Sequence, residues 1–313
     1  MVTILVITTV LMSGCGSYGT DHELDTERNY RQHMRDFVQD ISAYAKGIKL
    51  NFILIPQNGH ELLTENGEET ETLAVAYLDA IDGIGREDLL YGYNGDDRAT
   101  PVSERDDMIS FLDIAENNAV EVLVTDYCST RSFVDDSYYQ NAARGYISFV
   151  ADHRELGNIP KYPVNPYHVN ASNVTSLTEA RNFLYLINPG SFPSRDAFLD
   201  AIRETNYDII IIDLFYHDIA LTASEVASLR IKANGGSRLI IAYLSIGEAE
   251  DYRYYWQTEW QTNLPPWLAE ENPDWPGNYK VRYWDKDWLF FTDFGDILER
   301  KDPHQKSSLK HRR

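Results

Sequence analysis

Residues 238–256 read RLIIAYLSIGEAEDYRYYW, and this stretch decides the predicted fold. Its first part, residues 238–244, is a nearly continuous apolar run, which is typical of a parallel strand buried on both faces. Two carboxylates, Glu248 and Glu250, follow the strand, and a dense cluster of Tyr and Trp comes next. Carboxylates bond hydroxyls or amines and aromatic rings stack on sugar faces, so the pattern indicates a carbohydrate-binding cleft. A helix start with acidic residues in its first turn would look the same, and this stretch alone leaves both interpretations open.

Further apolar runs alternate with amphipathic stretches along the chain. The predicted strands are residues 51–55 (NFILI), 80–84 (AIDGI), 120–125 (VEVLVT), 146–150 (YISFV), 183–187 (FLYLI) and 208–213 (DIIIID). The predicted helices include one after Asp25 or Thr26 that ends near Gly47, and residues 104–117, 195–205 and 224–234. Alternation of strands and helices is typical of a parallel α/β fold.

Polar residues follow nearly every predicted strand. Examples are Gln57, Glu87, Asp126 and Asp213. A doubly wound sheet would collect such residues near one switch point, whereas a (β/α)8 barrel builds its site from all the strand-to-helix loops. We therefore expect a TIM-barrel type of α/β fold, with these side chains gathered at one mouth of the barrel.

The composition excludes some partners. The chain has 313 residues and a formal net charge of −21, which argues against nucleic acid because phosphate binding needs a basic surface. The charge is compatible with a cationic substrate, although solubility explains it equally well. No glycine-rich phosphate loop, zinc motif or redox motif is present, so we expect no cofactor and no metal.

The amino-terminal stretch, MVTILVITTVLMSGC, is a short apolar run that ends in small residues before Cys15. It is too short for a membrane span and resembles a signal peptide. Its last five residues resemble a bacterial lipobox, in which the cysteine is lipidated. We therefore expect residues 1–15 to be a lipoprotein signal peptide and residues 16–25 a tether. Lipid on Cys15 would anchor the protein to a membrane outside the cytoplasm.

Six segments together resemble glycoside hydrolase family 114. They are residues 55–63 (IPQNGHELL), 81–94 (IDGIGREDLLYGYN), 122–128 (VLVTDYC), 207–216 (YDIIIIDLFY), 242–256 (AYLSIGEAEDYRYYW) and 272–285 (NPDWPGNYKVRYWD). The family comprises endo-α-1,4-polygalactosaminidases and related proteins. The resemblance implies a (β/α)8 barrel and retaining hydrolysis of galactosamine-containing polysaccharides, and it extends over residues 28–288.

The resemblance also implies roles for individual residues. Glu87 matches the general acid/base. The expected substrate-binding residues are Gln57, Asn58, Asp126, Tyr127, Asp213, Tyr243, Glu248, Glu250, Trp284 and Asp285.

Two departures from the family separate this chain from its relatives. First, the order is rotated, as in a circular permutation or a fusion of two half-barrels, which a closed barrel tolerates because its termini can move to surface loops. Second, the family's fourth strand, which carries the expected nucleophile, has no counterpart after Trp288, and residues 290–313 resemble a disordered, non-family tail. We therefore expect an incomplete barrel of about seven strands within residues 26–289.

The missing strand has two consequences. It should leave a gap between the strands at residues 238–244 and 51–55, while the strand at 183–187 should lie beside the one at 146–150. It should also remove activity, because a retaining mechanism needs a second carboxylate about 5 Å from the first. The sequence thus leaves two hypotheses. One is a glycoside hydrolase of the endo-α-1,4-polygalactosaminidase type, and the other is a catalytically inactive truncated homologue or carbohydrate-binding protein.

Overall fold

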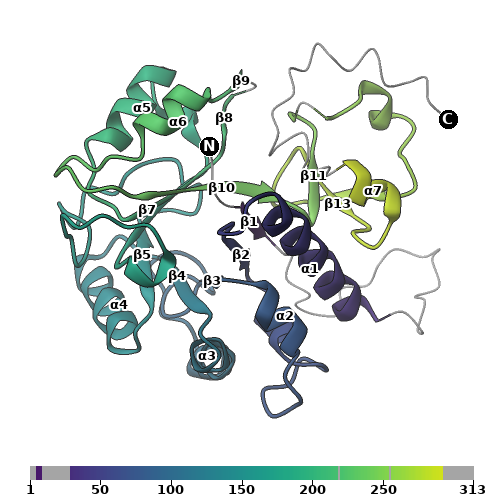
Figure 1. The fold of residues 1–313 in the computed structure, drawn as a ribbon, viewed down its shortest axis with the longest axis horizontal. Coiled ribbons are helices and arrows are strands. Elements are labelled where there is room, and N and C mark those ends of the chain that lie inside the picture. The colour runs from purple at the N-terminus through teal and green to yellow at the C-terminus, as the bar shows by residue number, and fades with distance from the viewer. Residues whose placement is uncertain (1–4, 9–28, 218, 254, 292–313) are drawn as a thin grey trace.

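The computed structural model describes residues 5–8, 29–217, 219–253 and 255–291 (Figure 1). Its main feature is an eight-stranded parallel sheet in the order β5-β4-β3-β2-β1-β10-β7-β6. The strands are β1 (Leu5–Thr8), β2 (Leu54–Gln57), β3 (Gly83–Glu87), β4 (Glu121–Tyr127), β5 (Ile147–Ala151), β6 (Phe183–Leu186), β7 (Ile209–Ile212) and β10 (Leu239–Ser245). Each of the seven runs predicted as strands overlaps one strand of this sheet, although β2 and β3 begin about three residues later than predicted and Ala80 ends α2.

Helices alternate with these strands along the chain. They are α1 (Tyr30–Ile48), α2 (Val75–Ala80), α3 (Val102–Asn117), α4 (Arg131–Ala143), α5 (Arg195–Arg203), α6 (Ala223–Ser228) and α7 (Lys286–Phe291). Short 3-10 helices are η1 (His60–Leu63), η2 (Leu177–Glu179), η3 (Pro189–Ser191) and η4 (Thr258–Gln261). In Figure 1, β10 runs from the part that carries α5 and α6 toward the part that carries β11, β13 and α7.

The first long helix illustrates how local sequence sets an element. The side chain of Asn29 accepts a hydrogen bond from the backbone N–H of Gln32 at 3.0 Å, which caps α1. The predicted start at Asp25 or Thr26 falls outside the described residues. The buried face of α1 consists of apolar residues at helical spacing, Met34, Phe37, Val38, Ile41 and Ala45.

Two smaller sheets, which the sequence did not predict, interrupt this alternation. The strands β11 (Glu248–Glu250), β12 (Leu268–Glu271) and β13 (Asn278–Val281) form an antiparallel sheet in the order β11-β13-β12. The strands β8 (Phe215–Tyr216) and β9 (Ile219–Ala220) form an antiparallel pair. Tryptophan rings pack beside the three-stranded sheet, with ring centroids 4.9 Å apart for Trp260 and Trp267. The aromatic cluster that suggested a cleft therefore also forms a core.

The two faces of the main sheet pack differently. One face contacts the helices, so that Leu54 and Val122 lie in one apolar cluster with residues of α1, α2, α3 and α4. On the other face, Phe149 of β5 and Phe183 of β6 have ring centroids 5.7 Å apart. This contact joins the two ends of the hydrogen-bonded strand order and confirms that these strands are neighbours. The arrangement is a mixed α/β fold compatible with a TIM-barrel-like architecture.

The predicted gap in the sheet is filled, which corrects the expectation of a seven-stranded sheet. Leu5 of β1 pairs with Leu54 of β2 on one side and with Ala242 of β10 on the other. The sequence of β1 is LVIT, and such β-branched, apolar residues suit a central parallel strand as well as a leader. Composition alone could not separate these two roles. Cys15, the expected lipidation site, and most of the predicted tail lie outside the described residues.

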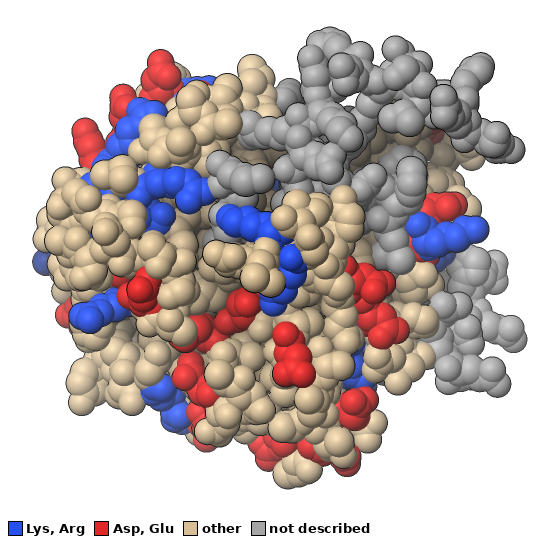
Figure 2. All heavy atoms as spheres, viewed as in Figure 1, with Lys and Arg blue, Asp and Glu red and all other residues tan. Residues whose placement is uncertain are grey.

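Figure 2 shows how charge is distributed over one face of the molecule. Acidic side chains spread over the lower part of this view, where Figure 1 places α2 and α3, and basic side chains gather toward the upper left. Within the residues that the structure describes, no helix combines the length and the apolar character needed to cross a membrane.

Candidate active site

The parallel strands bring several predicted site residues to one edge of the sheet, here called the carboxyl-end edge. Gln57, Glu87 and Tyr127 are the last residues of β2, β3 and β4. Asp213 directly follows β7, and Tyr243 lies near the end of β10. Because Ile212 pairs with Ala242, Asp213 and Tyr243 lie side by side on neighbouring strands. The carboxyl-end edge is where α/β folds carry their active sites.

Glu87 has a half-buried carboxylate that two side chains hold in place. Nδ2 of Asn58 donates to Oε2 of Glu87 at 2.8 Å, and the hydroxyl of Tyr127 donates to Oε1. The backbone N–H of Glu87 donates in turn to Oδ1 of Asn58 at 3.2 Å. Asn58 has a φ of 60°, a left-handed conformation that Asn tolerates better than most residues. Each carboxylate oxygen of Glu87 therefore has a fixed donor.

A buried arginine lies behind this arrangement. Nη1 of Arg86 is 3.4 Å from Oδ1 of Asn58 and 3.5 Å from Nδ1 of His60. Burial lowers the pKa of Arg86, and nearby acidic groups oppose this shift. Burial, with a smaller effect from Arg86, lowers the pKa of His60 to about 3. His60 is therefore neutral at pH 7, and Asn58 links Arg86 to Glu87.

Gln57 is buried at the end of β2 and lies over Gly85 of β3. A Cβ atom on Gly85 would be 1.8 Å from Oε1 of Gln57, so only glycine leaves room for this side chain. The two residues are partners in the parallel register. The position of Gln57 at the carboxyl-end edge thus depends on a glycine in the neighbouring strand.

Asp88 and Arg154 support the same edge, although the sequence did not single out Arg154. Nη2 of Arg154 is 2.6 Å from Oδ1 of Asp88, and its guanidinium lies 4.4 Å from the ring centre of Tyr127. Burial raises the pKa of Asp88, and the hydrogen bond and charge of Arg154 oppose this shift. The two residues are 66 positions apart, so no local sequence pattern could reveal the pair.

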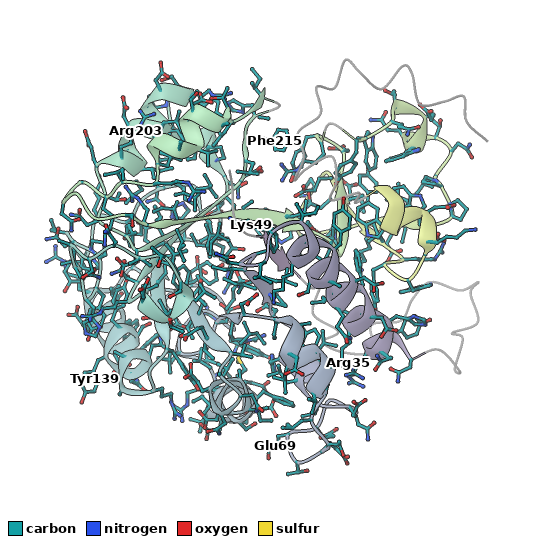
Figure 3. The ribbon with its side chains drawn as sticks, in the orientation of Figure 1. Arg35, Lys49, Glu69, Tyr139, Arg203 and Phe215 are labelled. Carbon is teal, nitrogen blue, oxygen red and sulfur yellow. The ribbon has the colours of Figure 1, made fainter. Side chains whose placement is uncertain are left out.

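A second charged cluster joins the main sheet to the three-stranded sheet. Nη1 of Arg253 is 2.7 Å from Oδ2 of Asp213, and its Nε donates to Oε2 of Glu250. The guanidinium also lies 5.7 Å from the ring centre of Phe215, which Figure 3 places between the two parts of the molecule. Burial raises the pKa of Asp213, and Arg253 opposes this shift. Burial alone would lower the pKa of Arg253. The charges of Glu250 and Asp213 raise it by more than burial lowers it, so the net shift is upward.

Glu248 is held within the three-stranded sheet. Nδ2 of Asn272 donates to its Oε1 at 2.7 Å, and Nδ2 of Asn278 donates to its Oε2 at 3.2 Å. The hydroxyl of Tyr252 lies 3.3 Å from Oδ1 of Asn278 and donates to Glu250 at 2.8 Å. Hydrogen bonds thus connect Glu248 through Asn278 and Tyr252 to the cluster around Arg253.

Asp126 is fully buried near the end of β4, and its carboxylate bonds to α4 and to the loop after β3. Its carboxylate accepts hydrogen bonds from the backbone N–H groups of Leu90 at 2.8 Å and Tyr91 at 3.2 Å. It also accepts from the hydroxyl of Ser137 at 2.6 Å and from Asn141. This geometry lets Asp126 hold the loop that follows Glu87, which is a structural role.

Trp284 and Asp285 lie beside helices. Ring centroids of Trp284 and Tyr30, the first residue of α1, are 4.7 Å apart. Oδ1 of Asp285 accepts from the backbone N–H of Asp287 at 2.9 Å, at the start of α7. Among the contacts of the described residues, none joins Trp284 or Asp285 directly to Glu87.

Tyr185 of β6 also lies at this edge, and sequence reasoning missed it. Its exposed fraction is 2 %, and its ring centroid is 6.5 Å from that of Tyr243. Burial raises the pKa of Tyr185, and the charge of Glu87 raises it further. The residue falls inside the apolar run FLYLI, where a tyrosine reads as one more core residue.

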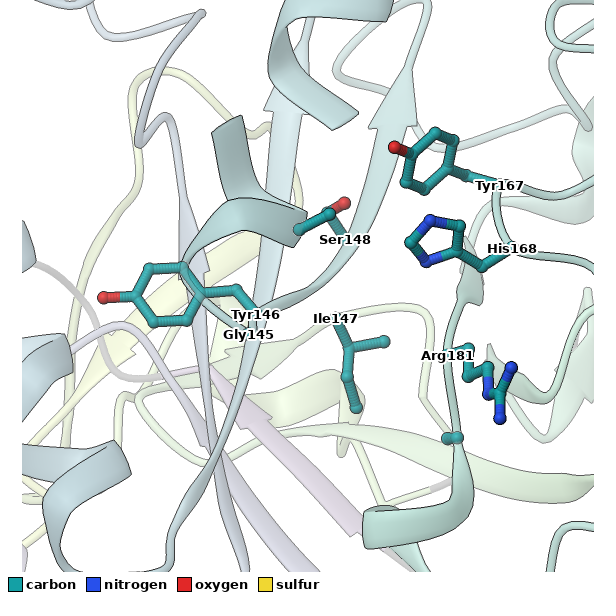
Figure 4. Close-up of a pocket in the computed structure, with 9 residues that line it drawn as sticks. Gly145, Tyr146, Ile147, Ser148, Tyr167, His168 and Arg181 are labelled. Atoms are coloured by element: carbon teal, nitrogen blue, oxygen red, sulfur yellow. The ribbon is translucent and has the colours of Figure 1, made fainter. Parts of the chain in front are cut away.

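Figure 4 shows a cavity at the opposite edge of the sheet. It has a volume of about 320 Å³ and is lined by Ile147 and Ser148 at the start of β5, and by Tyr167, His168 and Arg181. It lies at the amino ends of β5 and β6, whereas Glu87 lies at a carboxyl end. In the described part of the chain, no group of three or more His, Cys, Asp or Glu side chains could hold a metal ion.

Comparison with known families identifies the carboxyl-terminal part of the chain. Residues 171–301 match the model of glycoside-hydrolase family GH114. This segment of the chain is similar to GH114. The segment contains Asp213, Tyr243, Glu248 and Glu250, and it confirms the family expected from the sequence. It ends at residue 301, beyond residue 289, where we expected the barrel to end, and Glu87 and Asn58 lie outside it.

Three relatives match parts of the chain. An uncharacterized protein of Methanocaldococcus jannaschii is 38% identical over 134 residues, which are 42% of this chain and 38% of the relative. One from Deinococcus radiodurans is 44% identical over 90 residues, 29% of this chain and 28% of the relative. One from Thermotoga maritima is 42% identical over 102 residues, 32% of this chain and 31% of the relative. The chain thus spans well under half the length of each relative.

Proposed function

We propose that this protein is a glycoside hydrolase that acts at the carboxyl-end edge of a TIM-barrel-type fold, with Glu87 as its general acid/base. One observation carries the proposal: both carboxylate oxygens of Glu87 have a fixed side-chain donor, Asn58 for one and Tyr127 for the other. Proton transfer to a glycosidic oxygen needs a carboxyl group held in one orientation. Similarity to GH114 supports the reaction class.

The substrate that we propose is a galactosamine-containing polysaccharide, cleaved in the manner of an endo-α-1,4-polygalactosaminidase. This follows the GH114 resemblance, and the formal net charge of −21 supports a substrate with amino groups. Residues 26–151 would supply the second half of a circularly permuted family barrel. In that arrangement β1 occupies the position of the family's fourth strand.

A second candidate function is glycan binding without cleavage. Hydrolysis with retention needs a second carboxylate about 5 Å from the first. Asp213 and Glu250 are both ion-paired with Arg253, and Glu248 is held by two asparagines. These engaged carboxylates favour a protein that binds the polymer and does not cut it.

Measurement of cleavage and binding on the same substrate separates the two candidates. The purified chain would be mixed with partially deacetylated α-1,4-linked galactosamine polymer, and reducing ends would be counted while binding is followed by tryptophan fluorescence. A β-1,4-linked glucosamine polymer serves as the matched control. Release of reducing ends from the first polymer alone supports the hydrolase. Binding without release supports the second candidate, and absence of both contradicts each of them.

As an alternative fate of the amino-terminal run, we propose a lipid anchor at Cys15 that holds the protein to a membrane outside the cytoplasm, on the strength of the lipobox-like sequence before it. Lipidation there would remove residues 1–14, and β1 with them, so the anchored form would keep the seven strands that the sequence predicts in place of the eight-stranded sheet. Expression of the chain and of Cys15→Ser in bacteria tests this. The anchored protein should sediment with membranes and the variant should not. Equal recovery of both in the soluble fraction would contradict the anchor.

A further inference from the structure

The strand register places Tyr185 next to the pair formed by Glu87 and Tyr127. Glu87 pairs with Thr125, and Thr125 pairs with Phe149, so these residues share one level of the sheet. The ring of Phe183 contacts Phe149 from the neighbouring strand. Side chains alternate along a strand, so Tyr185, two residues beyond Phe183, points to the same face and lies one level closer to the carboxyl-end edge. Tyr127 lies two residues beyond Thr125 and reaches the same level.

Tyr127 and Tyr185 both lie near Glu87, but only the hydroxyl of Tyr127 donates a hydrogen bond to its carboxylate. No hydrogen bond of the Tyr185 hydroxyl is found among the described residues, and its oxygen is not one of the buried polar atoms without a partner, so the hydroxyl of this 2 % exposed side chain stays open to a ligand. A tyrosine hydroxyl that is not bonded to a neighbouring side chain can donate a hydrogen bond to a ligand and accept one from it. The raised pKa of Tyr185 keeps this hydroxyl protonated at neutral pH, so it can donate a hydrogen bond.

We propose that the hydroxyl of Tyr185 binds a hydroxyl or amine of the sugar residue on which Glu87 acts. Tyr185 is then a substrate-binding residue, whereas Tyr127 is a positioning residue that acts through Glu87. The ring of Tyr243, 6.5 Å from that of Tyr185, forms an adjacent wall of the same subsite. This inference rests on the proposed function and adds a specific ligand group to it.

The test compares Tyr185→Phe with a matched control, Tyr77→Phe. Tyr77 of α2 has a buried hydroxyl without a partner among the described residues, and it packs in the cluster between helices and sheet. Affinity for a galactosamine oligosaccharide and the midpoint of thermal unfolding would be measured for both variants. Tyr185→Phe should weaken binding about tenfold to a hundredfold, the effect of removing one buried hydrogen bond to a ligand, with unchanged thermal stability. Tyr77→Phe should bind like the unaltered protein.

Tyr127→Phe separates positioning from binding. It should lower kcat and leave the affinity for the oligosaccharide close to that of the unaltered protein, because its hydroxyl contacts Glu87. In a protein that binds without cleaving, Tyr127→Phe should simply keep that affinity, while Tyr185→Phe should still lose it.

Three results would overturn the assignment of Tyr185. Equal affinity of Tyr185→Phe and the unaltered protein would contradict this assignment alone. A large loss of thermal stability in Tyr185→Phe would show that its hydroxyl has a structural role. Failure of the unaltered, folded protein to bind the oligosaccharide would contradict the proposed function and this assignment together.

Discussion

Nδ2 of Asn58 lies 2.8 Å from Oε2 of Glu87, and the bond joins the ends of two neighbouring strands. Asn58 directly follows β2 and Glu87 ends β3. The same asparagine accepts a hydrogen bond from the backbone of Glu87 and contacts Arg86 through Oδ1. One side chain therefore fixes the carboxylate, its backbone and the buried cation behind it.

Replacement of Gly85 by alanine should disturb this edge. A Cβ atom there would meet Oε1 of Gln57 at 1.8 Å, so Gly85→Ala should lower the free energy of unfolding by about 1–3 kcal/mol. Gly47→Ala is the matched control, because nothing lies within 4 Å of its Cβ position in α1, and it should stabilise by about 0.5–1 kcal/mol. Urea unfolding measures both. Unchanged stability of Gly85→Ala would show that Gln57 does not occupy this position.

Removal of Arg253 should destabilise the junction between the two sheets. Arg253→Met leaves the buried carboxylate of Asp213 without its cation, and breaking a buried ion pair in this way costs about 3–5 kcal/mol at pH 7. The double variant Asp213→Asn, Arg253→Met should recover part of this loss. A single variant as stable as the unaltered protein would contradict the importance of the pair.

The loss in free energy of unfolding caused by Arg253→Met should also depend on pH. Burial raises the pKa of Asp213 in the folded protein and Arg253 opposes this shift, so the pKa should rise further once Arg253 is removed. A carboxyl whose pKa is raised on folding loses stability as pH rises above its unfolded pKa, so the variant should lose more stability with rising pH than the unaltered protein. The deficit of Arg253→Met should therefore shrink as the pH falls from 7 toward 4. A deficit that stays constant over this range would assign the loss to packing.

His60 should make the protein less stable in acid. Its pKa is lowered to about 3 in the folded protein from an unfolded value of 6.5, so its contribution to stability is complete above pH 6.5 and is lost as pH falls toward 3. The loss from this residue should reach about 2 kcal/mol by pH 5, where only the unfolded histidine is protonated. His60→Phe should lack this part of the pH dependence. Parallel pH profiles for both proteins would contradict the neutral, buried state of His60.

The amides of β1 should be protected from exchange with solvent. Residues 5–8 pair with β2 and β10 on both sides, so their backbone N–H groups belong to the centre of the sheet. Hydrogen–deuterium exchange of the full chain should show slow exchange for these residues, comparable to β10. Fast exchange at residues 5–8 together with slow exchange in β10 would contradict the pairing of β1 and support the gap that the sequence predicted.

The sequence revealed the strands because buried parallel strands are continuous apolar runs, as in residues 209–212 and 239–242. It assigned residues 5–8 to a leader, whereas the structure pairs them with β2 and β10, because the run LVIT suits a leader and a central strand equally well. It missed the three-stranded sheet, whose short strands, such as EAE in β11, carry no apolar period. The ends of the predicted strands indicated Glu87 and Asp213 as site residues. The pairing of Asp213 with Arg253, and of Asp88 with Arg154, could not be predicted, because no local pattern encodes such contacts.

The most direct test of the central claim is the rate of reducing-end release by Glu87→Gln compared with Glu69→Gln. Glu69 is an exposed glutamate near α2, labelled in Figure 3, and receives the same change of charge. If Glu87 is the general acid/base, Glu87→Gln should lower the rate on galactosamine polymer by about 10²–10⁴-fold and keep its affinity, while Glu69→Gln should match the unaltered protein. Cleavage by Glu87→Gln at the full rate would contradict the role of Glu87 and the site built around it.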